Sequence, residues 1–205
     1  MYFIRSYGRR KNRQQKEISS DFLVKNLPSL DFKNYHLEIG FGNGEMLLNN
    51  SILNKEICYL GVDVYKNGIN KVLKGIEKNQ LKNLYIYEMD VRELLEKISE
   101  KFFSQIYIFF PDPWPKKKQK KRRLINESFA KILDKKLKIS GKILFSSDHK
   151  DYFEDVLNIF KEYNYQINYI FRCLGKDAPF VLSRYGEKAQ KKEILCNYFM
   201  GTKTC

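Results

Sequence analysis

The segment HLEIGFGNGE, residues 36–45, decides how the rest of the chain is interpreted. It begins as a short apolar run typical of a strand, continues through three glycines spaced G-x-G-x-G, and leads into the apolar residues 46–48. Glycines allow a tight turn and let a ligand approach the backbone closely. The segment therefore predicts a strand, a ligand-binding turn and the start of a helix.

Short apolar runs alternate with amphipathic stretches from Tyr35 onward. The expected strands lie near residues 35–39, 57–62, 84–89, 106–110 and 142–146. Two further strands near 166–172 and 193–200 are separated by a loop, so we expect them to close the sheet as an antiparallel C-terminal hairpin. The pattern predicts an α/β fold with a doubly wound, mostly parallel, seven-stranded Rossmann-like sheet.

We expect a single domain over residues 35–205, preceded over residues 1–34 by a basic arm and a lead-in helix. A chain of 205 residues suits one domain with a substantial core. Within residues 1–17, arginines and lysines surround Tyr2, Phe3 and Tyr7. Such arms are often disordered, and some bind nucleic acid through phosphate contacts and base stacking.

The chain is strongly basic. It has 38 Lys and Arg against 24 Asp and Glu, which gives a formal net charge of +14. A charge of this sign usually indicates a polyanionic partner, and RNA, DNA and an acidic membrane all remain open on composition alone. A generally lysine-rich composition is the alternative explanation, so the distribution of the charges must decide.

The cysteine and histidine content and the hydropathy of the chain also indicate its cellular compartment and whether it binds a metal. Four cysteines are scattered without a close pair, and only His36 and His149 are available to join them, so we expect neither a zinc site nor a disulfide framework. No apolar run approaches the length of a membrane span. The expected location is the reducing cytoplasm.

Acidic residues follow three successive expected strands. Glu38 and Glu45 flank the glycine turn, Asp63 closes the second strand and Asp90 follows the third. Such charges would repel a dinucleotide pyrophosphate but attract the sulfonium and ammonium groups of S-adenosylmethionine. Asp63 is placed to accept hydrogen bonds from the ribose hydroxyls, and Asp90 from the adenine amino group. Acids at strand ends are also common on ordinary surfaces. The residues predicted to hold this cofactor are Glu38, Gly40, Gly42, Gly44, Asp63 and Asp90.

The segment IYIFFPDPWPKKKQKKRR, residues 106–123, is where we expect the chemistry. A buried strand is followed by a proline-rich loop, and because each proline disfavours the helical region for the residue before it, Asp112 and Trp114 are expected to be extended. Seven cations then follow within residues 116–123. An ordinary turn followed by a solvated helix face is the alternative. Together these features favour a site for an aromatic, anionic substrate.

These residues together resemble the bacterial tRNA (guanine-N7)-methyltransferases, a family of class I methyltransferases. The resemblance runs nearly end to end and is most specific at residues 109–114, with Lys116 and the basic residues 121–123. It implies S-adenosylmethionine as cofactor without a metal, tRNA as partner, and methylation of the guanosine at position 46 in the tRNA variable loop. It also implies that Asp112 lies at the active centre beside the cofactor, and that Lys116 and Asp148 contact tRNA.

One C-terminal segment departs from the family pattern, which usually shows threonine, a basic residue, an aromatic residue and glutamate. The matching substrate-binding residues here are Ser183, Arg184, Tyr185 and Gly186. Serine keeps the hydroxyl group, whereas glycine lacks the carboxylate. Glu187 is the next residue and could replace that carboxylate after a small backbone adjustment. An exposed polar loop is the alternative interpretation of this segment.

Guanine N7 carries a free lone pair at neutral pH, so we expect Asp112 to act as a fixed anion rather than as a base. Trp114 either stacks on a base or packs under the loop. The alternatives are an amino-group methyltransferase of RNA or DNA, a non-catalytic RNA-binding protein on the same fold and, last, a dinucleotide-dependent oxidoreductase. We expect a monomer or a homodimer. We expect no DNA or membrane partner and no obligatory protein partner.

Overall fold

The computed structural model describes residues 20–28, 31–173, 191 and 193–205. In chain order the elements are β1 (Asn34–Ile39), α1 (Glu45–Leu53), β2 (Ile57–Asp63), α2 (Lys66–Asn79), β3 (Leu84–Glu88), α3 (Val91–Lys97), β4 (Phe103–Phe109), the 3-10 helix η1 (Lys117–Arg122), α4 (Glu127–Lys136), β5 (Leu137–Ser147), α5 (Lys150–Glu162), β6 (Tyr165–Cys173) and β7 (Cys196–Lys203).

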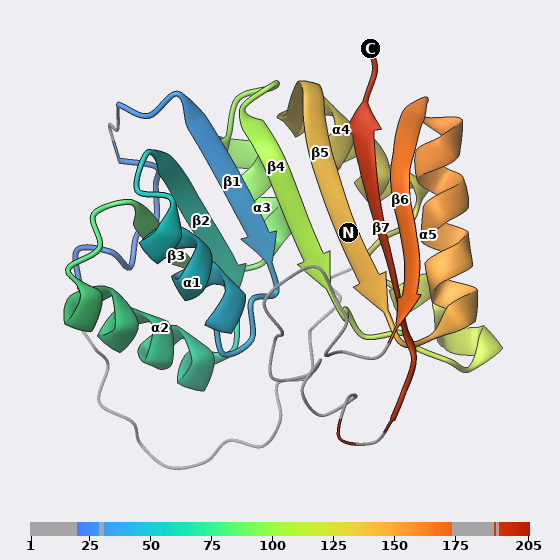
Figure 1. The fold of residues 1–205 in the computed structure, drawn as a ribbon, viewed down its shortest axis with the longest axis horizontal. Helices are drawn as coiled ribbons and strands as arrows, with labels where there is room; N and C mark the ends of the chain where they lie inside the picture. Colours follow the sequence, from blue (N-terminus) through green and yellow to red (C-terminus); the bar gives the residue numbers. More distant parts are fainter. Residues whose placement is uncertain (1–19, 29–30, 174–190, 192) are drawn as a thin grey trace.

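The strands form one seven-stranded sheet in the order β3-β2-β1-β4-β5-β7-β6 (Figure 1). Strands β1 to β5 pair in parallel, whereas β7 is antiparallel to both β5 and β6. The predicted α/β sheet and its antiparallel C-terminal hairpin are therefore confirmed. The expected strand near 142–146 proves to be the end of a longer strand that begins at Leu137.

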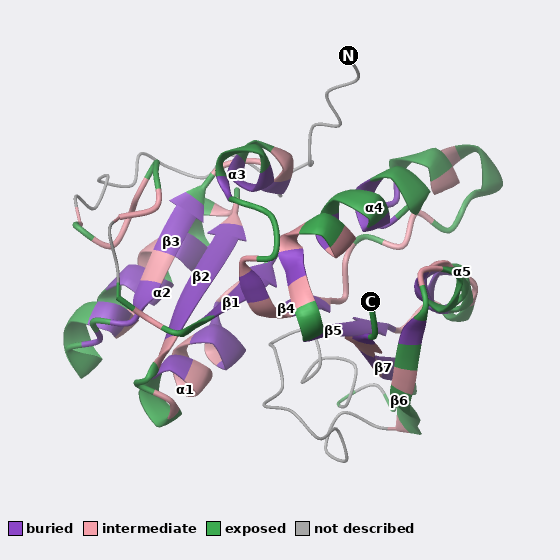
Figure 2. Cartoon of the chain, turned by 90° about the horizontal axis from the view of Figure 1, so that it is seen from above, coloured by how far each residue is buried: buried purple, intermediate pink, exposed green. Residues whose placement is uncertain are grey.

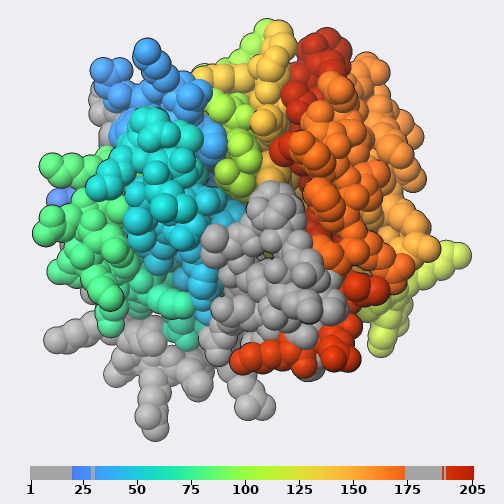
Figure 3. All heavy atoms as spheres, viewed as in Figure 1, coloured from blue at the N-terminus to red at the C-terminus, as the bar shows by residue number. Residues whose placement is uncertain are grey.

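Helices cover both faces of the sheet. Seen along the sheet, α3, α4 and α5 lie on one face and α1 and α2 on the other (Figure 2). In the space-filling view of the face that carries α1 and α2, these two helices occupy one side, and β6 and α5 lie on the opposite side (Figure 3). Because parallel strands all point the same way, the carboxyl ends of β1 to β5 meet at one edge, where open α/β sheets bind ligands.

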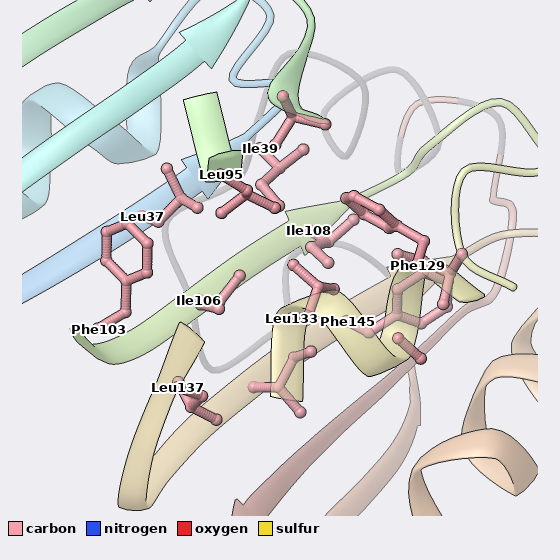
Figure 4. Packing of buried hydrophobic residues seen from close by; sticks show 14 of the residues in the cluster. Leu37, Ile39, Leu95, Phe103, Ile106, Ile108, Phe129, Leu133, Leu137 and Phe145 are labelled. Carbon is pink, nitrogen blue, oxygen red and sulfur yellow. The ribbon is translucent and has the colours of Figure 1, made fainter. Parts of the chain in front are cut away.

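The largest core lies between the sheet and α3, α4 and α5. Leu37 and Ile39 from β1 lie near Leu95 of α3, and Ile106 and Ile108 from β4 lie near Leu133 of α4 (Figure 4). Burial of these apolar side chains is the main force that fixes the helices on the sheet. Strands β1 and β4 thus serve as the rigid base from which the adjoining loops project.

A small side chain sets the distance between α1 and the opposite face of the sheet. A Cβ atom on Gly61 of β2 would lie 2.4 Å from Cδ2 of Leu47 and 2.9 Å from Cδ1 of Phe41. Any larger residue would push α1 and the preceding turn away from β2, because close-packed interiors do not absorb extra atoms freely. Gly61 therefore helps to define where the turn after β1 lies.

The lead-in helix expected within residues 1–34 does not form in the described residues 20–28 and 31–33. Instead, Leu23 makes a parallel bridge to Ile86, with hydrogen bonds from Val24 N–H to the Ile86 carbonyl and from Ile86 N–H to the Phe22 carbonyl. Phe22 and Leu23 also pack against the second core. Pairing with β3 is favoured over helix formation here, because the edge of β3 has unpaired backbone N–H and C=O groups. This segment supplies hydrogen-bond partners for them. The basic arm, residues 1–17, lies outside the described residues.

Among the described helices, none is both long enough and apolar enough to cross a bilayer. In the same part of the chain, no group of three or more His, Cys, Asp or Glu side chains is arranged to hold a metal ion.

Candidate active site

A pocket of about 330 Å³ lies at the carboxyl ends of β1, β2, β3 and β4. It therefore occupies the edge of the sheet at which the sequence places its acidic residues. Three aspartates and two arginines contribute to an otherwise largely apolar wall. These charged lining residues are Asp63, Asp90, Arg92, Asp112 and Arg122.

The turn after β1 is built on left-handed glycines. Gly40, Gly42 and Gly44 have φ angles of 71°, 59° and 73°, a region in which any other residue would be strained. Open space surrounds the Cβ positions of Gly40 and Gly42, whereas a Cβ on Gly44 would lie 2.1 Å from Cγ2 of Val72. Gly40 and Gly42 thus leave room for a ligand, and Gly44 is required by the packing of α1 against α2.

Gly68 supports the glycine turn, a role that was not predicted from the sequence. It lies in the first turn of α2, and a Cβ atom there would approach the Gly42 carbonyl oxygen to 1.7 Å. Because Gly68 has no Cβ atom, the start of α2 can pack directly against the backbone of the glycine turn. The sequence signal was a glycine near the start of a helix in which good helix formers are otherwise preferred.

Asp63 connects the glycine turn with the end of β2. Its carboxylate accepts hydrogen bonds from the backbone N–H groups of Gly42 at 2.8 Å, Val64 at 2.6 Å and Tyr65 at 2.9 Å. Burial raises the pKa of Asp63, while these three hydrogen bonds oppose that shift. The carboxylate is thus held rigidly in the pocket wall with part of its acceptor capacity still available.

Glu38 is the most deeply buried acid near the turn. Its pKa is raised well above the ordinary value, first by burial and then by the charges of Asp63 and Glu45. Its Oε2 atom is buried and has no hydrogen-bond partner among the described residues. A buried carboxylate without a partner is costly, so this arrangement favours a cationic ligand beside Glu38.

Asp90 begins α3 as its N-cap residue. Its Oδ1 atom accepts a hydrogen bond from the Arg92 N–H at 2.8 Å, and the Arg92 guanidinium lies 3.3 Å from the same oxygen. Capping alone accounts for an aspartate here. Asp90 nevertheless lines the pocket together with Arg92, a second residue that the sequence reasoning missed.

The loop after β4 places Asp112 and Trp114 at the pocket. Asp112 is exposed to solvent and Trp114 is partly buried. The prediction that Trp114 is extended is wrong, because its φ angle is 43°, in the left-handed region. The competing contacts are a hydrogen bond from Arg123 to the Pro113 carbonyl at 2.9 Å and the Arg122 guanidinium lying 4.9 Å from the indole centroid.

The cations of residues 116–123 divide into two groups. The exposed group comprises Lys116, Lys117, Lys118, Lys121 and Arg122. Lys120, by contrast, pairs with Asp151 of α5 at 2.8 Å, and Arg123 is buried against the same helix. Hydrogen bonds from Lys120 and then Arg123 lower the pKa of Asp151 to about 2, which keeps that carboxylate ionised. Only the exposed group is placed to meet a polyanion in the solvent.

The other predicted substrate contacts are Asp148 and the C-terminal segment 183–187. Asp148 follows β5 at the same edge of the sheet as the pocket and is partly buried, although it does not line the pocket. Its charge adds to burial in raising the pKa of Cys196, at the start of β7, to about 11. The predicted residues Ser183, Arg184, Tyr185, Gly186 and Glu187 lie outside the described residues.

Comparison with known proteins decides between the remaining classes. A family model described as "Putative methyltransferase" matches residues 33–195. The tRNA (guanine-N(7)-)-methyltransferase of Neorickettsia sennetsu is 33% identical over 199 residues, which cover 93% of this chain and 87% of that protein. The chain belongs to the tRNA (guanine-N7)-methyltransferase family.

The chain is also similar to part of a larger protein and to solved structures of the same fold. The bifunctional methyltransferase of Rickettsia prowazekii is 32% identical over 195 residues, covering 90% of this chain but only 38% of the larger protein. Among solved structures, the 16S rRNA methyltransferase KamB superimposes with a TM-score of 0.65 over 85% of this chain and 89% of that one. At 10% sequence identity, this likeness shows a shared fold alone.

Proposed function

We propose that this protein transfers a methyl group from S-adenosylmethionine to N7 of a guanosine in tRNA, giving 7-methylguanosine. The observation that carries the proposal is the convergence of Asp63, Asp90 and Asp112 on one pocket beside a glycine turn that leaves ligand space. The names of the closely similar relatives support the substrate and the methylated atom. The family resemblance supports the variable loop as the target.

Charge and shape at the pocket and at the adjoining glycine turn, where Glu38 and Gly42 lie outside the pocket lining, support this cofactor. Glu38 has a buried oxygen without a partner among the described residues, and a ligand ammonium group would supply one. Asp63 and Asp90 would accept hydrogen bonds from the ribose hydroxyls and the adenine amino group. Gly40 and Gly42 leave their Cβ positions open, which allows close approach to the backbone. When bound, S-adenosylmethionine supplies an electrophilic methyl group.

Asp112 would provide the negative charge that the reaction requires. The N7 lone pair forms the new bond to the methyl carbon while the bond from that carbon to sulfur breaks, so no proton is removed. Positive charge therefore builds up on the base during the step. A carboxylate fixed beside the ring stabilises that charge without itself reacting. The exposed position of Asp112 at the pocket leaves it accessible to a base from a large substrate.

Surface cations would hold the tRNA. Lys116, Lys117 and Lys118 are exposed next to the pocket loop, and their charges suit phosphate contacts that do not depend on sequence. Asp148 and residues 183–187 would contact the nucleoside, with Glu187 as the candidate carboxylate for the position held by Gly186. A monomeric or homodimeric state, a cytoplasmic location and one domain over residues 35–205 stay predictions.

The deciding experiment incubates the protein with methyl-labelled S-adenosylmethionine and a tRNA transcript, followed by nucleoside analysis. Label is expected in 7-methylguanosine. A second transcript with adenosine in place of the variable-loop guanosine should accept no label. Label in an N-methylated exocyclic amino group would contradict the proposal, and full labelling of the second transcript would contradict the variable-loop target.

A further inference from the structure

Arg123 is a buried arginine directly beside the active-site loop. Its side chain is only 4% exposed, although it follows a run of exposed lysines. Burial of a guanidinium is costly unless its nitrogens find acceptors and its charge is paired. The contacts around Arg123 show how this is achieved.

Each side of the guanidinium has its own partner. Nε donates to the Pro113 carbonyl oxygen at 2.9 Å, and Nη2 donates to Asp151 Oδ2 at 2.7 Å. Nη1 donates to Asp155 Oδ2, and the Arg123 Cζ atom lies 4.7 Å from the Tyr152 ring centroid. Asp151 and Asp155 are one turn apart on α5, so they meet the planar fork together. One end of Arg123 is thus fixed to a helix and the other end to the loop.

The loop contact falls between the two residues that matter most at the pocket. Pro113 separates Asp112 from Trp114, so the hydrogen bond to its carbonyl orients the peptide group that leads into Trp114. Trp114 has a strained left-handed φ angle, which persists only where surrounding contacts enforce it. Arg122 covers the indole ring while Arg123 holds the preceding carbonyl. Consecutive arginines therefore fix the side chain and the backbone of the same loop.

We propose that Arg123 is a positioning residue, which holds the Asp112–Trp114 segment in its active geometry through the Pro113 carbonyl. The proposal rests on the proposed function. Burial excludes Arg123 from phosphate binding, in contrast to Lys117 and Lys118, which are exposed. Arg123 acts on the reaction through the loop and touches neither the methyl donor nor the base. Displacement of a catalytic group by about 1 Å can cost on the order of 100-fold in rate.

The main test variant is Arg123→Lys. Lysine keeps the positive charge. Its single ammonium group cannot, however, donate to the Pro113 carbonyl oxygen and to the carboxylates of Asp151 and Asp155 at the same time. At saturating cofactor and tRNA, the single-turnover methyl-transfer rate should fall about 10-fold to 100-fold. The dissociation constants for tRNA and cofactor should stay within about twofold, because the lost contact is not part of either binding surface.

Trp114 is the only tryptophan in the chain, so its fluorescence reports on this loop directly. Quenching by acrylamide should increase in Arg123→Lys, since the indole loses its fixed setting. The matched control is Lys203→Met. Lys203 is also a buried cation, paired with Asp134 at 3.1 Å, but it lies at the end of β7 and not at the pocket. This variant should lower the melting temperature while leaving both the quenching and the methyl-transfer rate unchanged.

The outcomes separate the possible roles of Arg123. If Arg123→Lys has a normal methyl-transfer rate and normal quenching, Arg123 serves only the stability of the fold. If the dissociation constant for tRNA rises while the rate stays normal, Arg123 is a phosphate contact. A lower rate with unchanged quenching would also overturn the proposal.

If Arg123→Lys does not fold, Asp155→Asn should show the same fall in rate and rise in quenching at smaller amplitude. The absence of both changes would overturn the proposal. If the wild type methylates no tRNA, the proposed function fails, whereas the quenching comparison still tests whether Arg123 fixes the loop.

Discussion

The backbone N–H of Gly42 donates a hydrogen bond of 2.8 Å to Oδ2 of Asp63. This bond joins the turn after β1 to the end of β2, so one carboxylate shapes the turn and faces the pocket at the same time. Loss of Asp63 should consequently affect both the cofactor site and the stability of the fold.

We predict that Asp63→Ala weakens S-adenosylmethionine binding by about 1.5 to 3 kcal/mol, because a charged hydrogen-bond acceptor is lost. This corresponds to roughly a 10-fold to 150-fold rise in the dissociation constant. The free energy of unfolding should also fall, since three backbone N–H groups lose their acceptor. Calorimetry measures the first effect, and tRNA affinity should stay nearly constant. Glu77→Ala on the exposed side of α2 is the control. Unchanged cofactor affinity in Asp63→Ala would remove Asp63 from the site.

Glu38 should make cofactor binding depend on pH. Burial and the neighbouring charges of Asp63 and Glu45 raise its pKa in the free protein, whereas a bound ammonium group would favour the ionised form. Binding should therefore release a proton, and affinity should rise with pH until Glu38 is ionised in the free protein. Calorimetry in buffers of different ionisation enthalpy counts the released protons. Glu38→Gln should abolish this release and weaken binding by about 1.5 to 3 kcal/mol. Equal proton release in the variant would assign the effect to another group.

The same raised pKa has the opposite effect on stability without cofactor. The folded protein holds a proton on Glu38 at pH values where the unfolded chain has already lost it. Stability should therefore fall as pH rises from the unfolded pKa through the raised folded pKa. At pH values above the raised folded pKa, Glu38→Gln should be more stable than the wild type. At pH values below the unfolded pKa, the two proteins should be more similar in stability. Urea unfolding at pH 5 and pH 8 compares the two proteins, and a destabilised variant at both values would contradict the expectation.

Affinity for tRNA should fall steeply and log-linearly as salt rises, because phosphate contacts release counterions. The double variant Lys117→Gln, Lys118→Gln should flatten the slope by about two if each lysine contacts one phosphate. Lys120→Gln should change the slope less, since Lys120 already pairs with Asp151 at 2.8 Å. Filter binding over a salt series measures the slopes. Identical slopes for the wild type and the double variant would make this segment an ordinary solvated face.

Asp112→Asn should lower the single-turnover rate by on the order of 100-fold, because it removes the anion while keeping the side-chain shape. Cofactor affinity should change less than in Asp63→Ala. Since N7 gives up no proton, the contribution of Asp112 should be constant between pH 6 and pH 9 with saturating cofactor and tRNA. A pH-dependent limb that disappears in Asp112→Asn would show that proton transfer belongs to the step. Full activity in the variant would make Asp112 structural.

Local sequence patterns predicted the parts of this protein that depend on nearby residues. The glycine turn and the acids after successive strands follow from alternation and spacing, and Asp63 and Asp90 do lie in one pocket. Trp114 was predicted wrongly because the preference set by the following proline is weak compared with tertiary contacts. Arg123 could not be assigned its role, since its partners Asp151 and Asp155 lie 28 and 32 residues further along the chain. Burial alone separates it from the lysines beside it.

The position of β7 in the sheet also constrains how the protein is made. Of the seven strands, β7 is the last to leave the ribosome, yet it lies between β5 and β6 and supplies the only sheet neighbour of β6 in the described part of the chain. A nascent chain that ends before residue 196 therefore exposes the edge of β5 and has no template for residues 165–173. Such an edge pairs readily with other chains. Before β7 forms, only the five parallel strands have their sheet neighbours, so this is the stage at which a chaperone would protect the exposed edge.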